Sequence, residues 1–381
     1  MNNIPYARQW IEDEDIMVVA ASMDGDWLTQ GPGVKAFEDA VADYCGARYA
    51  VAVNSGTAAL HLASLVAEVR KGDEVITSPI TFVASANCVL YCGGRPVFAD
   101  ICPDTMNIDP DAIKKKITSK TKAIIPVDFA GHPCDLEVIH RIARKHGLTV
   151  VEDAAHALGA KYNRKKIGSC NYSDMTVLSF HAVKHITTGE GGMILTNNKL
   201  FYEKLLMLRT HGITREKKKL NKTNDGDWYY EMQFLGYNYR ITDFQCALGT
   251  KQMERLRNFI ERRREIVERY NNAFKEVEGI TIPIEKKGIV SSWHIYVIRV
   301  KERRREIFDA LRRSGIGVNV HYIPVYLQPY YQALGYKKGL CPNAEDYYRS
   351  AITLPLFPRM KDYEVNRVIS RVRECVLRKR S

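Results

Sequence analysis

Between residues 46 and 200, the spacing of hydrophobic residues along the chain switches repeatedly between two patterns. Short β-branched runs such as YAVAVNS alternate with stretches such as GTAALHLASLVAE, in which apolar residues recur at helical spacing. Strands and helices that trade places at this interval predict βαβ units and a mainly parallel, doubly wound α/β sheet. We expect strands at 49–55, 73–79, 95–101, 122–131, 148–155, 175–181 and 192–198, with helices at 56–68, 81–93 and 136–147.

A different pattern follows the long helical stretch between residues 242 and 276. It predicts a strand at 294–300, a helix at 305–315, a strand at 316–322 and a final helix. We therefore expect a large domain over residues 1–250 and a small C-terminal α/β domain over residues 251–381. The N-terminal segment could pack on the small domain.

The length and composition fit an enzyme better than a small binding module. A chain of 381 residues can bury a substantial core. It has no apolar run of about 18 residues and no signal-peptide pattern at its start, so we expect a soluble, cytoplasmic protein without a membrane anchor. The nine cysteines are scattered and form no C-x-x-C pair, which argues against a disulfide framework or a zinc ribbon. Most should be buried apolar side chains.

The net charge of +12 is concentrated in the last third of the chain. Residues 251–381 hold 28 Lys and Arg against 15 Asp and Glu. Segments such as RNFIERRREIVERY mix both signs with apolar residues at helical spacing, which is typical of solvated amphipathic helices. No nucleic-acid recognition motif accompanies the charge, so we favour this interpretation over a nucleic-acid surface. A smaller anion, such as a nucleotide diphosphate, remains compatible with it.

In a doubly wound sheet, ligands bind at the carboxyl ends of the strands, so residues at these junctions are the candidates for chemistry. In VNSGTAALHLA, a predicted strand ends at Asn54, and Ser55, Gly56 and Thr57 open a helix. Backbone N–H groups at a helix start and a glycine that permits close approach suit a phosphate. An ordinary N-cap explains the same residues.

A second junction, VVEDAAHALGA, places Glu152 and Asp153 after an apolar strand, with His156 three residues further on. An ionised carboxylate here could keep a heteroaromatic nitrogen protonated through a charge-assisted hydrogen bond. A helix cap or a structural ion pair is the alternative.

The third junction, SFHAVKHITTGEGG, holds Lys184 between His181 and His185. A lysine after a buried strand loses solvation, which lowers its pKa and makes it a Schiff-base nucleophile. Two histidines spaced i, i+4 share a face only in a helix, and the small residues that follow do not predict one. We therefore expect no metal site.

Two further stretches complete the set. Phe82 in TSPITFVASAN could cover a flat ring, although taken by itself it is better explained as a core aromatic at a helix start. LGYNYRITDFQCALG places Asn238 and Arg240 among aromatic residues. Pyridoxal phosphate requires an anion site, an acid partner for the ring nitrogen, a stacking surface and an imine-forming amine. The strand-end residues together match these requirements.

The ordered motifs NSGTAAL, EDAAHALGA, SFHAVKHITTGEGG and GYNYRITDFQCALG resemble the sugar-nucleotide aminotransferases of the DegT/StrS type. The resemblance covers nearly the whole chain and implies the fold of pyridoxal phosphate-dependent transferases of fold type I, which is aspartate aminotransferase-like. It implies that Lys184 forms the Schiff base and shuttles protons, while Asp153 pairs with the pyridine nitrogen. His156 would lie near the ring hydroxyl, where family members often have glutamine. The implied phosphate ligands are Gly56, Thr57 and Ser179, with Asn238 from the second subunit of a homodimer.

Within this family, TSPITFVASANCVLYCGGRPVFADI and VDFAGHPCDLE are most similar to transaminases of pseudaminic acid biosynthesis. That similarity implies transfer of the amino group of L-glutamate to a UDP-linked 4-keto sugar, with 2-oxoglutarate as the second product. The implied substrate contacts are Tyr6, Asp26, Trp27, Leu28, Thr29, Gly56, Ser179, Asn238, Val320, His321, Tyr322 and Ile323.

The lysine motif is shared with perosamine and aminoarabinose transaminases, so another UDP-, GDP- or dTDP-linked keto sugar is the alternative substrate. A protein of another class, regulatory or nucleic-acid-binding, could also retain the fold without the activity.

Overall fold

The computed structural model describes residues 3–221 and 226–378. Its centre is a seven-stranded sheet of order β1-β9-β8-β5-β4-β2-β3. The pairs β2–β3, β2–β4, β4–β5 and β5–β8 are parallel, and β9 runs antiparallel to both of its neighbours, β1 and β8. The predicted, mainly parallel sheet is therefore confirmed. Its strands are β1 (Tyr49–Val53), β2 (Glu74–Thr77), β3 (Arg95–Phe98), β4 (Thr121–Ile125), β5 (Thr149–Asp153), β8 (Met175–Ser179) and β9 (Gly192–Thr196).

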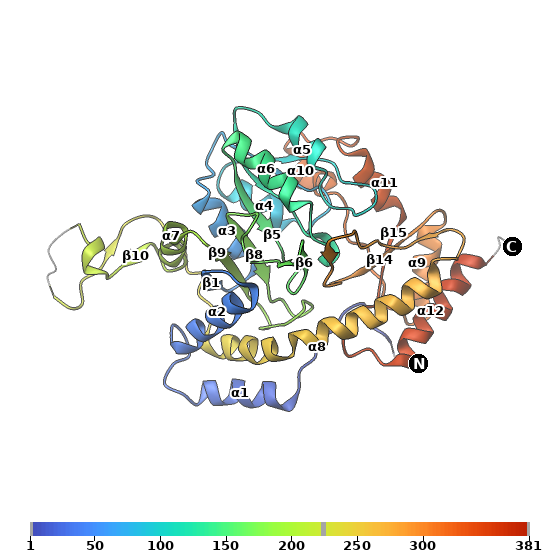
Figure 1. The fold of residues 1–381 in the computed structure, drawn as a ribbon, viewed down its shortest axis with the longest axis horizontal. Coiled ribbons are helices and arrows are strands. Elements are labelled where there is room, and N and C mark those ends of the chain that lie inside the picture. Colours follow the sequence, from blue (N-terminus) through green and yellow to red (C-terminus); the bar gives the residue numbers. More distant parts are fainter. Residues whose placement is uncertain (1–2, 222–225, 379–381) are drawn as a thin grey trace.

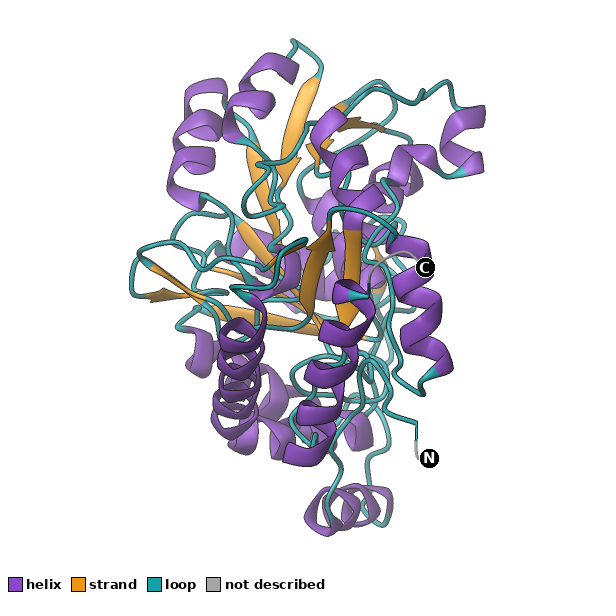
Figure 2. Cartoon of the chain, turned by 90° about the vertical axis from the view of Figure 1, so that its right-hand side faces the viewer, coloured by secondary structure: helices purple, strands orange, loops and turns teal. Residues whose placement is uncertain are grey.

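Helices cover both faces of this sheet, as Figures 1 and 2 show. Successive strand residues point to opposite faces, so Val51 and Val53 enter one apolar cluster while Ala50 and Ala52 enter the other. Because both faces of the sheet are buried, the strand sequences are continuous apolar runs. The first cluster includes α3 (Gly56–Val66), α4 (Ala84–Tyr91) and α7 (Lys199–Arg209); the second includes α2 (Pro32–Cys45), α5 (Pro110–Lys116), α6 (Leu136–His146) and α8 (Asp243–Phe274).

The C-terminal part of the chain forms a smaller antiparallel sheet of order β12-β14-β15. Its elements are β12 (Ile280–Thr281), β14 (Tyr296–Val300), α9 (Arg304–Arg313), α10 (Pro329–Ala333), α11 (Pro342–Ser350), β15 (Ala351–Leu354) and α12 (Asp362–Leu377). Ile4 joins this part of the core, and its backbone bonds to Gly315 and Gly317. Helix α8 runs along both parts of the molecule (Figure 1). Residue 250 lies inside it, and the division into two domains there stays a prediction.

The predicted strand at 316–322 is wrong. Only isolated bridges join Ile316 to Ile4 and Asn319 to Thr353. The β-branched pattern arises because Ile316 and Val318 are buried in the core, whereas the chain from Asn319 onward leaves the sheet and lines a cavity. The third strand of this sheet is β15, which was not predicted.

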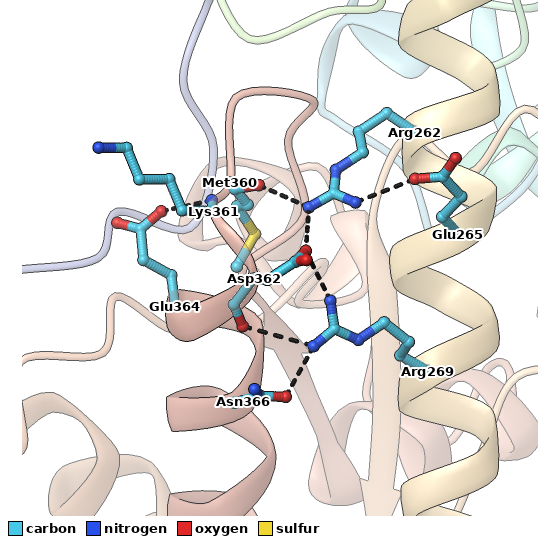
Figure 3. A network of polar contacts seen from close by, with 8 residues as sticks. All are labelled: Arg262, Glu265, Arg269, Met360, Lys361, Asp362, Glu364 and Asn366. Carbon is cyan, nitrogen blue, oxygen red and sulfur yellow. Dashed lines mark hydrogen bonds and ion pairs between the residues drawn. The ribbon is translucent and has the colours of Figure 1, made fainter.

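A polar network ties α8 to α12 on the surface, as Figure 3 shows. Arg262 contacts Glu265 at 2.9 Å and Asp362 at 2.7 Å. Arg269 bonds the same Asp362 oxygen at 2.7 Å and also Asn366 at 2.7 Å. Such exposed pairs contribute about 0–1 kcal/mol each, so their main effect is to balance charge on the helices. The contacts agree with the interpretation of this basic region as solvated amphipathic helices.

The remaining elements lie at the periphery. They are α1 (Asp13–Met23), the short strands β6 (Lys161–Tyr162), β7 (Lys165–Lys166) and β13 (Ile289–Val290), and the hairpin of β10 (Ile213–Thr214) with β11 (Glu231–Met232). The hairpin stands away from the body of the molecule (Figure 1). Residues 215–218, which follow β10, are exposed, and residues 222–225 lie outside the described ranges.

Two further expectations concern the cysteines and the membrane. All nine cysteines are free, with five buried and four partly buried. Within residues 3–221 and 226–378, no helix combines the length and apolar character needed to cross a bilayer.

Candidate active site

A cavity of about 610 Å³ lies where β5 and β8 end. Asp153 is the last residue of β5 and Ser179 the last residue of β8, so the parallel strands bring them to the same edge of the sheet. Residues from distant parts of the chain join them. The predicted site residues that line the cavity are Tyr6, Gly56, Thr57, Phe82, Asp153, His156, Ser179, Lys184, Val320, His321, Tyr322 and Ile323.

The N-terminus of α3 opens into this cavity. Ser55 is its N-cap, and its hydroxyl accepts a hydrogen bond of 3.1 Å from the Ala58 N–H. The N–H groups of the first helical turn have no partner within a helix and carry partial positive charge, which favours an anion. A Cβ atom on Gly56 would lie 3.1 Å from Ser179 Cβ and 3.2 Å from its Oγ. Glycine thus leaves room for a ligand between the turn and Ser179.

Asp153 is buried and held in one orientation. Its Oδ2 accepts a hydrogen bond of 2.6 Å from Ser85, and its Oδ1 accepts one of 3.1 Å from the Ala155 N–H. Burial raises the pKa of the Asp153 carboxyl, and the hydrogen bond from Ser85 is the largest effect that opposes this rise. The charge of Lys184 also opposes it.

Lys184 lies on a turn, not on a helix, and its N–H donates to the His181 carbonyl at 2.9 Å. Burial lowers the pKa of the Lys184 amine to about 8, although the charge of Asp153 acts to raise it. About a tenth of the amine is therefore neutral and nucleophilic at pH 7, far more than for a lysine in water.

The two histidines beside the lysine point to different surroundings. His181 is exposed, whereas His185 is buried and donates its Nε2–H to the Ser292 carbonyl at 3.1 Å. The part of the chain that the structure describes contains no group of three His, Cys, Asp or Glu side chains that could hold a metal.

His156 belongs to a cluster of buried rings on the cavity wall. Its Nε2 lies 3.3 Å from the Tyr322 hydroxyl, and its ring centroid lies 4.3 Å from that of His294. Burial lowers the pKa of His156 and of His294 well below the ordinary value, so both rings are neutral. Among the described residues, no group hydrogen-bonds to the buried Nδ1 of His156.

Phe82 lies on the rim of the cavity and is 59% exposed. Its ring centroid is 6.5 Å from that of Tyr322. The side chain is therefore not a core aromatic, which was the alternative explanation of this residue. An exposed apolar ring at a cavity rim can cover the face of a flat ligand.

The structure does not bring every predicted residue to this cavity. Asn238 is exposed on the chain segment that pairs with Thr210, and it does not line the cavity. Asp26, Trp27, Leu28 and Thr29 are also exposed and lie outside it, with Trp27 58% exposed. Their roles in substrate or cofactor binding stay predictions.

Several lining residues were not predicted, among them Ser85, His294, Asn319 and Gln328. Ser85 belongs to the same TSPITFVASAN stretch as Phe82, where the hydroxyls at a helix start were the available signal. His294 offered no signal, because only the fold places it beside His156.

Comparison with known proteins agrees with this geometry. A family model described as the DegT/DnrJ/EryC1/StrS aminotransferase family matches residues 9–373. The chain is 43% identical over 380 residues to the spore coat polysaccharide biosynthesis protein SpsC of Bacillus subtilis, covering 98% of this chain and 97% of SpsC.

Solved structures give the same result. Helicobacter pylori PseC, an aminotransferase involved in the biosynthesis of pseudoaminic acid, superposes with a TM-score of 0.91 at 33% identity, over 98% of this chain and 99% of PseC. The PMP-form of the putative sugar aminotransferase Spr1654 from Streptococcus pneumoniae has a TM-score of 0.92 at 33% identity, over 98% and 99% of the two chains. The predicted aminotransferase fold is confirmed.

Proposed function

We propose, from the premise that this chain belongs to the DegT/DnrJ/EryC1/StrS aminotransferase family, that it is a pyridoxal phosphate-dependent sugar-nucleotide transaminase. It would transfer the amino group of L-glutamate to C-4 of a UDP-linked 4-keto-6-deoxy-N-acetylhexosamine. The product would be UDP-4-amino-4,6-dideoxy-N-acetyl-β-L-altrosamine. One observation carries the proposal: Lys184, whose pKa is lowered to about 8, shares a cavity with Asp153 and the N-terminus of α3.

The residues of the cavity fit pyridoxal phosphate. The turn at Gly56 leaves a space that a Cβ atom would fill, and an anion there would meet the first N–H groups of α3. Asp153 offers a carboxylate to a ring nitrogen, and His156 lines the same cavity, where its ring would lie near a ring hydroxyl. When bound, the cofactor supplies a ring that takes up the electron pair left by a broken substrate C–H bond.

The protein side chains would perform the remaining tasks. Lys184 would hold the cofactor through its amine, and the same amine would be the group that accepts and returns a proton at the substrate carbon. Asp153 keeps the ring nitrogen protonated, and Ser85 holds the carboxyl in place. Phe82 covers one ring face from the rim. Ser179, together with the turn at Gly56, binds the phosphate.

We infer a homodimer with shared active sites, in which Asn238 enters the cavity of the partner subunit. Exposed apolar side chains support this inference, because large apolar areas on a surface are typical of interaction sites. They occur on α1 and the loop after it and on the projecting hairpin. They are Ile16, Met17, Met23, Trp27, Leu28, Trp228, Tyr230, Met232 and Leu235.

A second candidate is transamination of a different nucleotide sugar. The identity to SpsC, a spore coat polysaccharide biosynthesis protein, is 43%, whereas the identity to PseC is 33%. That difference favours a polysaccharide precursor as the substrate and leaves the reaction unchanged.

Glutamate-dependent amination should be assayed with purified protein across a panel of UDP-, GDP- and dTDP-linked keto sugars. Selective amination of the UDP-linked 4-keto-6-deoxy-N-acetylhexosamine would support the first candidate, and preference for another sugar would support the second.

Lys184→Ala should lower turnover by about 10⁴-fold or more, since imine formation and proton transfer are both lost. Cofactor should still bind without a covalent bond. Lys199→Ala, which alters an exposed lysine on α7, is the matched control. An active Lys184→Ala enzyme would refute the mechanism.

A further inference from the structure

His61 connects α3 to the chain segment that carries Asn238. The His61 side chain is 5% exposed, and its Nδ1 lies 3.1 Å from the Tyr239 hydroxyl. Its ring also meets Tyr237 edge-on, with 4.8 Å between the ring centroids. Tyr237 and Tyr239 stack on each other at 5.0 Å with an interplanar angle of 18°. Two tyrosines from the outer segment are thus anchored on one histidine of α3.

The extended backbone of this segment explains why Asn238 points away from α3. Side chains alternate along an extended chain, so the residue between two inward-facing tyrosines faces outward. Asn238 is accordingly exposed, while Tyr237 and Tyr239 are partly buried. The orientation that the tyrosines adopt therefore sets the direction in which the Asn238 amide projects.

Tyr239 contacts both α3 and Asn54, which lies two residues before the first residue of that helix. Its carbonyl accepts a hydrogen bond of 3.0 Å from the Asn54 N–H, immediately before the N-cap Ser55. Its hydroxyl reaches His61, about one turn after Thr57. The turn that lines the cavity lies between these two contacts. A shift of that turn would therefore act on Tyr239 through both contacts.

The other side of the segment is fixed to the end of α7. The Tyr237 N–H donates to the Leu208 carbonyl at 2.8 Å, and the Tyr239 N–H donates to the Arg209 carbonyl at 3.1 Å. The segment is thus attached to α7 by its backbone and to α3 by its tyrosine side chains. Among the described residues, the Tyr239 hydroxyl is the only hydrogen-bonding partner of the His61 ring, because Nε2 is buried without one.

We propose that the contact between His61 and Tyr239 couples the two active sites of the dimer. Binding of the cofactor phosphate at the N-terminus of α3 adjusts the position of the Asn238 segment through Tyr239, and the same subunit offers that segment to the cavity of its partner. This inference rests on the proposed homodimer and cofactor. His61 and Tyr239 are positioning residues, since they act through the turn and through Asn238. The first cofactor to bind positions a segment that the second site requires, so the second binds more tightly.

The test is a titration of the cofactor-free dimer with pyridoxal phosphate, followed by the visible absorption of the bound cofactor. The wild-type isotherm should be sigmoidal, with the second site about 5-fold or more tighter than the first. Tyr239→Phe, which keeps the stack and removes the hydroxyl, should make the two sites equal. His61→Leu should do the same by removing the ring. Tyr202→Phe is the control, because Tyr202 also stacks on a tyrosine, Tyr49, at 4.6 Å, but on α7.

A second measurement depends neither on enzymatic activity nor on the absorption of the cofactor. Hydrogen exchange at residues 236–240 should slow when the wild-type dimer binds pyridoxal phosphate, and the exchange rate should slow less in Tyr239→Phe. Sedimentation should show that each variant remains a dimer.

A wild-type isotherm with two equal sites, or a Tyr239→Phe dimer that keeps the full difference, would overturn the inference. If the wild-type enzyme still aminates a keto sugar in that case, the proposed function stands and only the coupling between the two sites is refuted. A protein that neither dimerises nor binds the cofactor would refute both.

Discussion

The Ser85 hydroxyl donates a hydrogen bond of 2.6 Å to Oδ2 of Asp153, joining the first turn of α4 to the carboxyl end of β5. This contact matters because burial alone raises the pKa of Asp153 and favours its neutral form. A neutral carboxyl cannot stabilise a protonated ring nitrogen by charge. The serine therefore both orients the acid and helps to keep it ionised.

Ser85→Ala should consequently lower turnover about 10-fold or more at neutral pH, as expected for loss of a hydrogen bond to a charged group. The pKa of Asp153 should rise further, so the acid limb of the pH–rate profile should move to higher pH. Steady-state rates of amination across the pH range provide the measurement. Ser64→Ala is the matched control, because Ser64 is also buried but donates to the Leu60 carbonyl. An unchanged acid limb in Ser85→Ala would contradict this role.

Attachment of the cofactor to Lys184 should depend on pH with a midpoint near the lowered pKa of about 8. Only the neutral amine is nucleophilic, so below the midpoint the rate should rise about tenfold for each pH unit and then level off above it. Stopped-flow absorption with cofactor-free protein measures this rate. A midpoint near the ordinary value of 10.5 would mean that Lys184 is not desolvated.

Gly56→Ala should weaken binding of pyridoxal phosphate about 10-fold, because the new methyl group would approach Ser179 Cβ at 3.1 Å and crowd the turn. The measurement is the dissociation constant from titration of cofactor-free protein. Gly25→Ala is the control, since a Cβ atom there would meet its nearest neighbour at an ordinary 3.5 Å. Equal affinity in both variants would show that the turn does not hold the phosphate.

Asp128→Asn should stabilise the protein at neutral and alkaline pH. Asp128 is fully buried and close enough to Glu152 to feel its charge, and among the described residues neither Asp128 Oδ2 nor Glu152 Oε1 has a hydrogen-bond partner, so a proton on one carboxyl would supply the missing donor. Burial, followed by the charge of Glu152, raises the pKa of Asp128 well above its ordinary value of 3.8. Since the folded pKa exceeds the unfolded one, the stability that this proton contributes is present at low pH and is lost as the pH rises.

An amide at residue 128 supplies the donor at every pH. The free energy of unfolding should therefore exceed that of the wild type by about 1–2 kcal/mol near pH 8, and the difference should shrink toward pH 4. Urea denaturation at several pH values measures it, with the exposed Asp24→Asn as control. A variant that is less stable than the wild type at pH 8 would show that Asp128 is needed as an acid.

Much of the large sheet and several candidate site residues could be predicted from local pattern. β-branched runs and helical periodicity identify strands and helices because the buried faces of an element determine which neighbouring positions are apolar. Lys184 and Asp153 could be found because each follows such a strand, and parallel strands end at one edge of the sheet. The strand at 316–322 was wrongly predicted because the local pattern reports burial and not strand pairing. Its β-branched residues are buried in the core, but only isolated bridges join this segment to other residues.

Contacts between residues far apart in sequence were decided by the tertiary structure alone. Ser85 and Asp153 are 68 residues apart, and His61 and Tyr239 are 178 apart. No periodicity spans such separations, because a hydrogen bond between side chains depends on how helices pack against the sheet. The pKa of Lys184 also depends on the tertiary structure. The sequence predicted that the pKa would be lowered, because Lys184 follows a buried strand, but the surroundings that desolvate the amine exist only once the chain has folded.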